Sequence, residues 1–385
     1  MKNKALHELN RLKEENLYRD MPDISEGAGK YIELGGKRYL NLSSNNYLGL
    51  SEIDSVRAEA VAAIQKYGTT SGASRIVTGN FSLYDELERK TASFKNCEKS
   101  LVFNSGYAAN LAVYTTLASR GTLVFSDKLN HASIIDGIRL SGAKHIRYKH
   151  CDMADLESLL EKHKDADDKI IATDTIFSMD GDVAPLHKII ALAEKYGAMT
   201  VIDEAHATGV FGRGRGYAHE VALADKIDVQ MGTYSKALGS FGGYAAARTE
   251  IIDLLRNKAR PFIYSTSLPP SVIGASVGAL KYMAKNPEIG GRLLDAAEEL
   301  RYFLQNLGFD TGRSVTQIIP VILGDNKRAL LAKEFLMEKG VYAAAIRPPT
   351  VPENTARLRL TLRLDIVDDL ELIKSAFKAL REAGI

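Results

Sequence analysis

One lysine lies among hydroxyl and glycine residues in the segment QMGTYSKALGSFGGYAAA, residues 230–247. The apolar residues on both sides indicate that Lys236 follows the end of a buried strand, which is an uncommon position for a charge. A lysine amine in such surroundings can form a Schiff base with a carbonyl group or act as a base, because burial lowers its pKa. Thr233 and Ser235 place two hydroxyl groups beside it.

Polar residues also end three other segments that have the pattern of strands. They are Asn104, Ser105 and Gly106 after SLVF, Ser178 and Asp180 after IATDTIF, and Asp203, Glu204 and His206 after TVI. Ligands bind beyond the carboxyl ends of the strands in open parallel sheets. If these strands are parallel neighbours, we expect all of these groups to converge on one crevice.

One ligand could use a lysine, a carboxylate and hydroxyl groups together. Pyridoxal 5'-phosphate needs an amine for a Schiff base, a carboxylate that keeps its pyridine nitrogen protonated, and a cradle for its phosphate. Lys236 and Asp203 can supply the first two. Gly106 and Tyr107, at a predicted helix N-terminus, can supply backbone amides beside the two hydroxyl groups.

Each of these groups also has a structural interpretation when it is taken alone. Lys236 could be a solvated surface charge, and Asp203 could cap the following helix. His131 and His206 could be ordinary interfacial histidines, and residues 105–113 could form an ordinary helix start. The functional interpretation is favoured because a single cofactor would use all of them.

Other chemistries lack their motifs. The glycine-rich stretch FGRGRGY, residues 211–217, follows HATGV instead of opening a helix with an acidic residue downstream, so it is weak as a dinucleotide motif. The sequence has no GxxxxGK[ST] and no GxSxG, and its histidines lack metal-ligand spacing, so we expect no metal. Cys97 and Cys151 form no CxxC pair, which favours two reduced thiols over a disulfide or a metal site.

The composition of the chain limits the classes of partner that we expect it to bind. The chain has 385 residues, 45% hydrophobic and 25% charged, with a formal net charge of +2 from 50 basic and 48 acidic residues that are interspersed. This balance argues against nucleic acid or an anionic membrane as the main partner. The N-terminus lacks the apolar segment of a secretory signal, and no run approaches the ~20 apolar residues of a membrane span. We therefore expect a cytoplasmic protein.

Strand and helix patterns alternate over most of the chain. Seven strand candidates are SLVFNSG, TLVFSD, HIRYKH, KIIATDTIFS, MTVIDEA, DVQMGTYSK and YAAAR, and amphipathic helices such as PLHKIIALAEKYG lie between most of them. This alternation predicts an α/β fold with a mainly parallel sheet covered on both faces. Longer helices and a few strands follow. We predict an N-terminal helix with short strands over 1–45, a large domain over 46–280 and a smaller one over 281–385.

The order of longer motifs resembles one known family. These are SSNNYLGL, SGASRIVTGN, FNSGYAAN, NHASIIDG, FSMDGDVAPL, VIDEAHATGVFGRGRG, TYSKALGSFGG, YSTSLPP and AIRPPTVPENTARLRLTL. Over nearly the whole chain they resemble the alpha-oxoamine synthases, which are pyridoxal-phosphate enzymes of fold type I. The resemblance implies a seven-stranded sheet between helices, a smaller α+β C-terminal domain, and a homodimer with the active site at its interface.

The resemblance also implies roles for the residues. Lys236 would hold the cofactor and move protons, Asp203 would pair with the ring nitrogen, and His131 would stack on the ring. His206 would contact the phenolic oxygen, and Ser178 would line the ring. The phosphate would be held by Gly106, Tyr107, Thr233, Ser235 and, from a second subunit, Thr266.

The implied reaction joins L-alanine to a pimeloyl thioester, on CoA or a carrier protein, with loss of carbon dioxide, and gives 8-amino-7-oxononanoate for biotin. Arg347 would bind the amino-acid carboxylate, with His131, Asn45, Arg19 and Thr350 also on the substrate side. Other family members join glycine to acetyl-CoA, as 2-amino-3-ketobutyrate CoA ligase does, or to succinyl-CoA, or serine to a long acyl thioester. A retained scaffold with a regulatory role is a further alternative.

Two segments depart from the family pattern. Phe81 and Ser82 stand where a histidine and a proline are expected, which affects the acyl-chain contacts. RLDIVDDLELI follows RLRLTL where small residues are usual.

Overall fold

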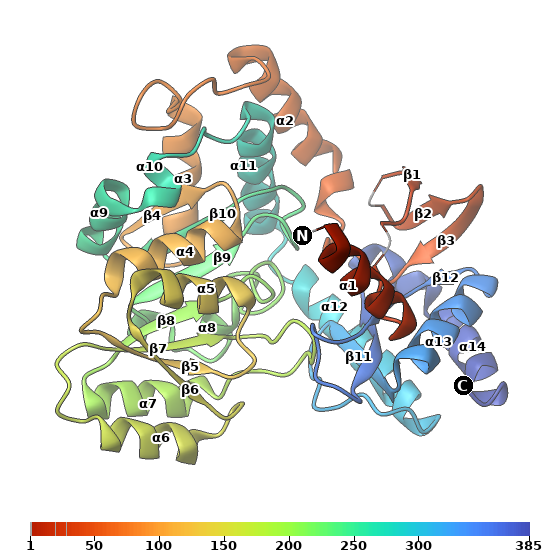
Figure 1. Cartoon of the computed structure of the whole chain (residues 1–385). Coiled ribbons are helices and arrows are strands. Elements are labelled where there is room, and N and C mark those ends of the chain that lie inside the picture. Colours follow the sequence, from red (N-terminus) through yellow and green to blue (C-terminus); the bar gives the residue numbers. More distant parts are fainter. Residues whose placement is uncertain (1, 20, 28) are drawn as a thin grey trace. The chain divides into compact units, whose positions relative to one another are not determined.

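The computed structural model describes residues 2–19, 21–27 and 29–385 (Figure 1). Contacts along the chain divide it into two units. Unit 1 combines the N-terminal segment up to Tyr47 with Met179–Asp182 and Arg292–Ile385, and unit 2 combines Leu48–Ser178 with Val183–Gly291. The boundary proposed near residue 280 lies inside helix α11 (Pro270–Lys285).

Unit 2 is built on a seven-stranded sheet in the order β4-β10-β9-β8-β7-β5-β6 (Figure 1). The strands are β4 (Lys99–Phe103), β5 (Leu123–Asp127), β6 (Lys144–Tyr148), β7 (Lys169–Asp174), β8 (Met199–Asp203), β9 (Val229–Thr233) and β10 (Gly243–Ala247). All neighbours are parallel except β10, which is antiparallel to both β4 and β9. The predicted fold class, a mainly parallel seven-stranded sheet, is confirmed.

Helices cover both faces of this sheet. Consecutive residues of β7 show why. Ile170 and Ala172 belong to one buried apolar cluster with the helices α4 (Gly106–Leu117), α5 (Ala132–Ser141), α9 (Thr249–Lys258) and α10 (Arg260–Ile263), whereas Ile171 belongs to a second cluster with α6 (Met153–Lys162) and α7 (Leu186–Tyr196). Side chains alternate across a strand, so a strand that is apolar throughout must be buried on both faces. The continuous apolar runs in the sequence are explained by this arrangement.

The helices of unit 2 connect and cover the strands of this sheet. They are α2 (Asp54–Tyr67), α3 (Ser82–Phe94), α4 (Gly106–Leu117), α5 (Ala132–Ser141), α6 (Met153–Lys162), α7 (Leu186–Tyr196), α8 (Tyr217–Glu220), α9 (Thr249–Lys258), α10 (Arg260–Ile263) and α11. α11 packs against both α2 and α3. Two 3-10 helices, η1 (Leu50–Glu52) and η2 (Ala224–Lys226), complete the unit.

Unit 1 contains two small sheets. A four-stranded sheet has the order β1-β2-β3-β12, and a three-stranded sheet has the order β11-β14-β13. Their strands are β1 (Ile24–Glu26), β2 (Tyr31–Leu34), β3 (Lys37–Asn41), β11 (Ile318–Gly324), β12 (Val341–Tyr342), β13 (Ala344–Ile346) and β14 (Ala356–Thr361). The helices are α1 (Lys2–Glu14), α12 (Ile289–Asn306), which begins in unit 2, α13 (Asn326–Glu338), η3 (Leu364–Asp369) and α14 (Leu370–Glu382).

The sequence VYAAAIRPP, residues 341–349, contributes two strands. β12 pairs in parallel with β3, whereas β13 pairs antiparallel with β14. The chain therefore changes sheet at Ala343. The β2–β3 hairpin turns at Gly35 and Gly36, both with positive φ, as the Gly-Gly pair predicts.

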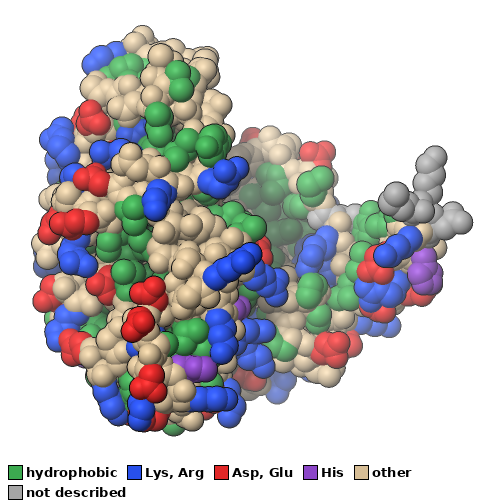
Figure 2. All heavy atoms as spheres, turned by 60° about the vertical axis from the view of Figure 1, so that its left-hand side comes forward, with side chains coloured by type: hydrophobic (Ala, Val, Ile, Leu, Met, Phe, Trp, Pro, Cys, Tyr) green, Lys and Arg blue, Asp and Glu red, His purple; other side chains and the backbone are tan. Residues whose placement is uncertain are grey.

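Basic and acidic side chains are interspersed over the face of the molecule in Figure 2, in line with the near-zero net charge. Within the part of the chain that the structure describes, no helix combines the length and apolarity needed to cross a bilayer.

Candidate active site

A cavity of about 210 Å³ lies in unit 2 at the carboxyl ends of β7, β8 and β9. Eight of the ten residues predicted to bind the cofactor line it. They are Gly106, Tyr107, His131, Asp203, His206, Thr233, Ser235 and Lys236, and Ser105, Ser133, Asp174, Ala205 and Met231 complete the lining. The structure thus brings together groups that are up to 130 positions apart in the sequence, since residues 106 and 236 both contribute.

Asp203 ends β8, and its carboxylate is held on both oxygens. Oδ1 accepts a hydrogen bond from the Ala205 amide at 2.8 Å, and Oδ2 accepts one from Asn110 Nδ2 at 2.8 Å. Asn110 also donates to Ser133 Oγ at 2.9 Å. Asp203 is only 5% exposed, so these donors fix the direction in which a buried negative charge is presented to the cavity.

A second carboxyl group stands next to it. Asp174 ends β7 and is paired with Asp203 in the register of the sheet. Burial, followed by the neighbouring Asp203 charge, raises the pKa of Asp174 well above its ordinary value. Asp174 Oδ2 accepts from the His131 amide at 2.7 Å, so this carboxyl holds the loop that carries the histidine.

His131 caps the N-terminus of α5. Its Nδ1 accepts from the Ser133 amide at 3.3 Å and lies 2.7 Å from Ser133 Oγ, which assigns the remaining ring proton of the neutral form to Nε2. The side chain is exposed at the cavity, yet the surrounding protein atoms desolvate the charged ring, and this lowers its pKa. The negative charge of Asp203 opposes this shift and the positive charge of Lys236 adds to it, and the net lowering of the pKa favours the neutral ring.

Gly106 and Thr233 form one end of the cavity. Helix α4 starts at Gly106, and its N-cap Ser105 accepts from the Ala108 amide at 3.0 Å. A Cβ at Gly106 would lie 2.5 Å from Thr233 Cγ2, so only glycine lets the helix approach β9 this closely. Thr233 Oγ1 is buried and has no hydrogen-bond partner among the described residues. A buried hydroxyl beside the N-terminus of a helix is suited to an anion.

Lys236 follows β9 in a loop that returns at once to β10. Gly239 and Gly242 both have positive φ, and a Cβ at Gly239 would lie 2.3 Å from the Ser51 amide nitrogen. The glycines therefore let the chain turn back in a crowded place. Lys236 lines the same cavity as Asp174 and His131, and its positive charge lowers the pKa of both.

These residues fit pyridoxal phosphate. The amine of Lys236, the buried carboxylate of Asp203 and the unsatisfied hydroxyl of Thr233 at the α4 N-terminus are the three parts that this cofactor requires. Asp203 ends β8, whereas Thr233 ends β9 and Lys236 follows it in the next loop.

Other residues predicted at the crevice lie outside the cavity lining. Ser178 is half-buried beyond the end of β7, and the carbonyl of the exposed Thr266 accepts from Asn104 Nδ2 at 2.7 Å. The expectation that Glu204 shares the crevice is wrong. Alternate residues of a strand face opposite sides, and Glu204 is paired with the buried Lys95. Asp180, in unit 1, binds Arg357 Nη1 at 2.7 Å.

Apart from His131, the residues predicted on the substrate side lie in unit 1. Arg19 Nη2 donates to Thr350 Oγ1 at 3.1 Å, so these two are in contact. Arg347 Nη2 donates to the Tyr18 carbonyl at 3.2 Å. Asn45 Oδ1 accepts from Arg359 Nη1 at 3.2 Å. Their role toward a substrate stays a prediction.

Asn110, Ser133 and Asp174 were not predicted as site residues. Asn110 had a detectable signal in the sequence, because it is a polar residue inside the apolar helical segment YAANLAV. In the structure its side chain is buried. Asp174 was hidden within a segment predicted as one strand up to Ser178, whereas β7 ends at Asp174.

Comparisons with known proteins agree on one group. Residues 37–375 match the family described as Aminotransferase class I and II. The chain is 49% identical over 359 residues to an 8-amino-7-oxononanoate synthase from Geobacter sulfurreducens, covering 92% of each chain. A solved serine palmitoyltransferase from S. paucimobilis with a bound PLP-myriocin aldimine is similar at a TM-score of 0.91, 30% identity, and 98% and 97% coverage. A solved 8-amino-7-oxononanoate synthase from Francisella tularensis has a TM-score of 0.77, 27% identity, and 90% and 99% coverage.

Proposed function

We infer that this chain, which belongs to the Aminotransferase class I and II family and within it to the 8-amino-7-oxononanoate synthases, condenses L-alanine with a pimeloyl thioester. The products are 8-amino-7-oxononanoate, carbon dioxide and the free thiol, and the step belongs to biotin biosynthesis. The protein is a pyridoxal-phosphate-dependent acyltransferase. The observation that carries the assignment is the single cavity in which Lys236, Asp203 and Thr233 meet.

Pyridoxal phosphate, when bound, supplies an electron-withdrawing ring that stabilises negative charge on the α carbon of an attached amino acid. Lys236 would hold the cofactor and move protons at Nζ. Asp203, fixed by Asn110 and the Ala205 amide, would keep a proton on the ring nitrogen. The neutral ring of His131 would orient the cofactor from the N-terminus of α5 without adding charge. The α4 N-terminus and the hydroxyl of Thr233 would bind the phosphate.

The remaining assignments concern substrate and assembly. Arg347 would bind the alanine carboxylate through its planar guanidinium, for which lysine is a poor replacement. We propose a homodimer in which Thr266 of one copy reaches the phosphate of the other. We also propose a cytoplasmic location, and a thioester donor carried by CoA or by an acyl carrier protein.

The test is a reconstituted reaction with the pyridoxal-phosphate-loaded protein. L-Alanine with pimeloyl-CoA should release free thiol and carbon dioxide in equal amounts, and mass spectrometry should detect 8-amino-7-oxononanoate. Pimeloyl-carrier protein is the second donor to compare. The Lys236→Ala variant should lose turnover by several orders of magnitude, while Lys164→Ala, at an exposed lysine, should keep it.

Glycine with acetyl-CoA and L-serine with palmitoyl-CoA are the competing pairs. Faster thiol release with either pair than with alanine and pimeloyl-CoA would overturn the substrate assignment and leave the cofactor assignment standing. Full activity in Lys236→Ala would overturn both.

A further inference from the structure

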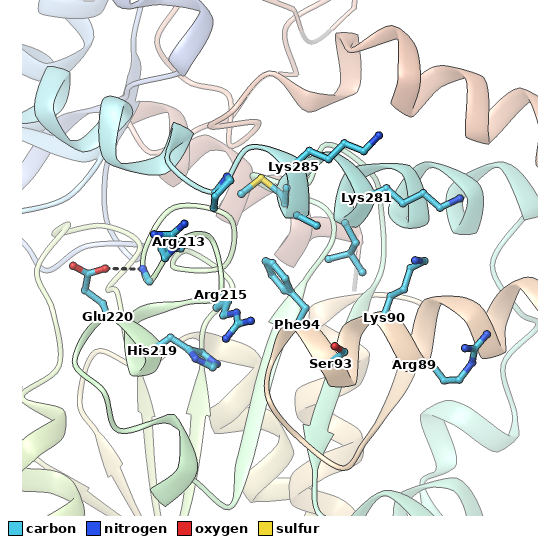
Figure 3. Close-up of a pocket in the computed structure, with 15 residues that line it drawn as sticks. Arg89, Lys90, Ser93, Phe94, Arg213, Arg215, His219, Glu220, Lys281 and Lys285 are labelled. Atoms are coloured by element: carbon cyan, nitrogen blue, oxygen red, sulfur yellow. Dashed lines mark hydrogen bonds between the residues drawn. The ribbon is translucent and has the colours of Figure 1, made fainter.

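A second, larger cavity lies in unit 2, away from the residues described above. It is a groove of about 1110 Å³ formed by the end of α3, the glycine-rich loop with α8 (residues 212–220) and the end of α11 (Figure 3). Six of its 15 lining residues are lysine or arginine, whereas the whole chain has 50 in 385. Glu220 is the one acidic residue of the lining. The groove is therefore far more basic than the nearly neutral chain.

The cations come from three separate elements. They are Arg89 and Lys90 on α3, Arg213 and Arg215 on the loop, and Lys281 and Lys285 on α11. Three of them are neutralised within unit 2: Arg213 by Glu288 at 2.9 Å, Lys281 by Glu59 at 2.7 Å, and Lys90 by Glu86 at 3.9 Å.

The other three cations form no ion pair among the described residues. These are Arg89, Arg215 and Lys285, and each is exposed. Glu220 forms no ion pair with any of the three among the described residues, and its Oε2 accepts a hydrogen bond from the Gly212 amide at 2.7 Å. Three uncompensated positive charges thus surround one concavity, an arrangement that favours an anion with more than one charge.

The floor of the groove is apolar. Half-buried Phe94 lies in the middle of Figure 3, with Arg215 and His219 on one side and Lys90 on the other. Leu280 and Met283 of α11 complete this floor. A Cβ at Gly214 would lie 2.4 Å from Met283 Cε and 3.5 Å from Phe94 Cζ, so only glycine lets the loop rest on it.

The wall that carries Arg215 is held firmly. The fully buried Lys95 donates to Glu204 Oε2 and to the Arg215 carbonyl, and the other carboxylate oxygen of Glu204 accepts from the Ala218 amide at 2.8 Å. A side chain on a wall that is already ordered loses less entropy on binding than one on a mobile loop. The glycine-rich stretch FGRGRGY, which has no place in the cofactor cavity, therefore forms a built wall of this groove.

We propose that this groove binds a nucleotide with at least two phosphate groups. An aromatic floor suits a base, which stacks on phenylalanine, and arginine and lysine suit phosphate oxygens. Cations on three separate elements suit a phosphate chain, which can contact several of them at once. Fifteen lining residues are fewer than the roughly 20–30 that each side of a standard protein interface contributes, which favours a small ligand over an acidic protein. The proposal stands independently of the proposed reaction.

The probe is ADP, titrated by calorimetry into full-length protein saturated with pyridoxal phosphate so that the cofactor cavity is filled. We expect a dissociation constant below about 1 mM that rises with ionic strength, since exposed charges are screened by salt. AMP should bind more weakly than ADP. Pyrophosphate, which has no base, should bind without using Phe94.

Two variants separate the parts of the groove. Arg215→Gln with Lys285→Gln should raise the dissociation constants of both ADP and pyrophosphate by about tenfold or more, because charge-assisted contacts are lost. Phe94→Leu should weaken ADP by about fivefold and leave pyrophosphate unchanged, because only base stacking is lost. The matched control, Arg120→Gln with Lys66→Gln, removes two exposed cations elsewhere in unit 2 and should change neither.

Absence of ADP binding to the wild-type protein would overturn the proposal, and so would unchanged binding in the Arg215→Gln, Lys285→Gln variant. Competition between CoA and ADP tells whether the bound nucleotide is part of a CoA thioester or a free nucleotide. If CoA displaces ADP through the same residues, the groove holds the nucleotide part of a CoA thioester, and if it does not, the ligand is a free nucleotide. Both outcomes sustain a nucleotide site, and thermal unfolding of each variant checks that it is folded.

Discussion

Replacing Lys95 with methionine should destabilise the folded protein by about 3–5 kcal/mol, the usual cost of removing one partner of a buried ion pair. The side chains of Lys95 and Glu204 are both 0% exposed, so no water can solvate the carboxylate that remains. In Lys95→Met, Glu204 keeps the Ala218 amide as a donor, and the Arg215 carbonyl loses its lysine donor. Methionine is similar in volume, so the loss is electrostatic and not a cavity effect.

Urea unfolding of the cofactor-free protein, followed by circular dichroism, measures the change. The double variant Lys95→Met, Glu204→Gln should recover about 2 kcal/mol of it, because no unpaired charge is left inside. The control is Lys195→Met, whose partner Glu157 lies at 2.7 Å with side chains 55% and 47% exposed, and this variant should lose far less stability because exposed ion pairs contribute little. Equal losses in Lys95→Met and Lys195→Met would refute the reasoning.

Three further predictions concern the cofactor cavity. Thr233→Val should weaken pyridoxal-phosphate binding about tenfold without lowering the stability of the cofactor-free protein, since an unsatisfied buried hydroxyl is removed. A cofactor titration measures the binding, and urea unfolding measures the stability. A loss of stability would contradict this prediction. Asn110→Leu should also weaken the cofactor about tenfold, because Asp203 loses a donor, and an unchanged dissociation constant would exclude this role. Since the pKa of Asp174 is raised, the folded state keeps a proton that the unfolded chain loses above about pH 4. The free energy of unfolding of the cofactor-free protein should therefore fall as pH rises from there toward the raised pKa, and Asp174→Asn should remove this decline. Urea unfolding midpoints at pH 5 and pH 8 measure the decline in each protein. An equal change between the two pH values in wild type and Asp174→Asn would disprove the prediction.

Much of the fold follows from local patterns. Alternating strand and helix patterns predicted all seven strands of the large sheet, and inner strands such as β7 are apolar runs because they are buried on both faces. The antiparallel direction of β10 follows from the short connection between β9 and β10. Only residues 234–242 connect β9 to β10, whereas a parallel crossover needs about a dozen residues or more. The end of β7 was harder to predict, since after Asp174 the Thr175 amide bonds to the Asp203 carbonyl at 2.9 Å, a contact that sequence patterns do not contain.

The site was predicted where single residues carry the chemistry. Lys236, Asp203 and Thr233 stand at strand ends, and the topology of a parallel sheet brings strand ends together. The supporting residues were missed because their roles depend on tertiary contacts. Asn110 is one turn inside a helix and reaches Asp203 only after α4 has packed on the sheet. Glu204 was misplaced because a strand position alone does not tell which face carries the ligand.

Unit 1 is built from segments that are far apart in the sequence, and this determines the order in which the two units can fold during synthesis. Leu40 of β3 pairs with Val341 of β12, so the four-stranded sheet of unit 1 lacks one strand until residue 341 has left the ribosome. At about 5–20 residues per second, the N-terminal segment waits roughly 15–60 s for its partner. Unit 2, whose sheet is complete at Ala247, can fold during that interval. A nascent chain from which residue 291 has emerged should therefore be protease-resistant over unit 2 and cleaved within its first 47 residues.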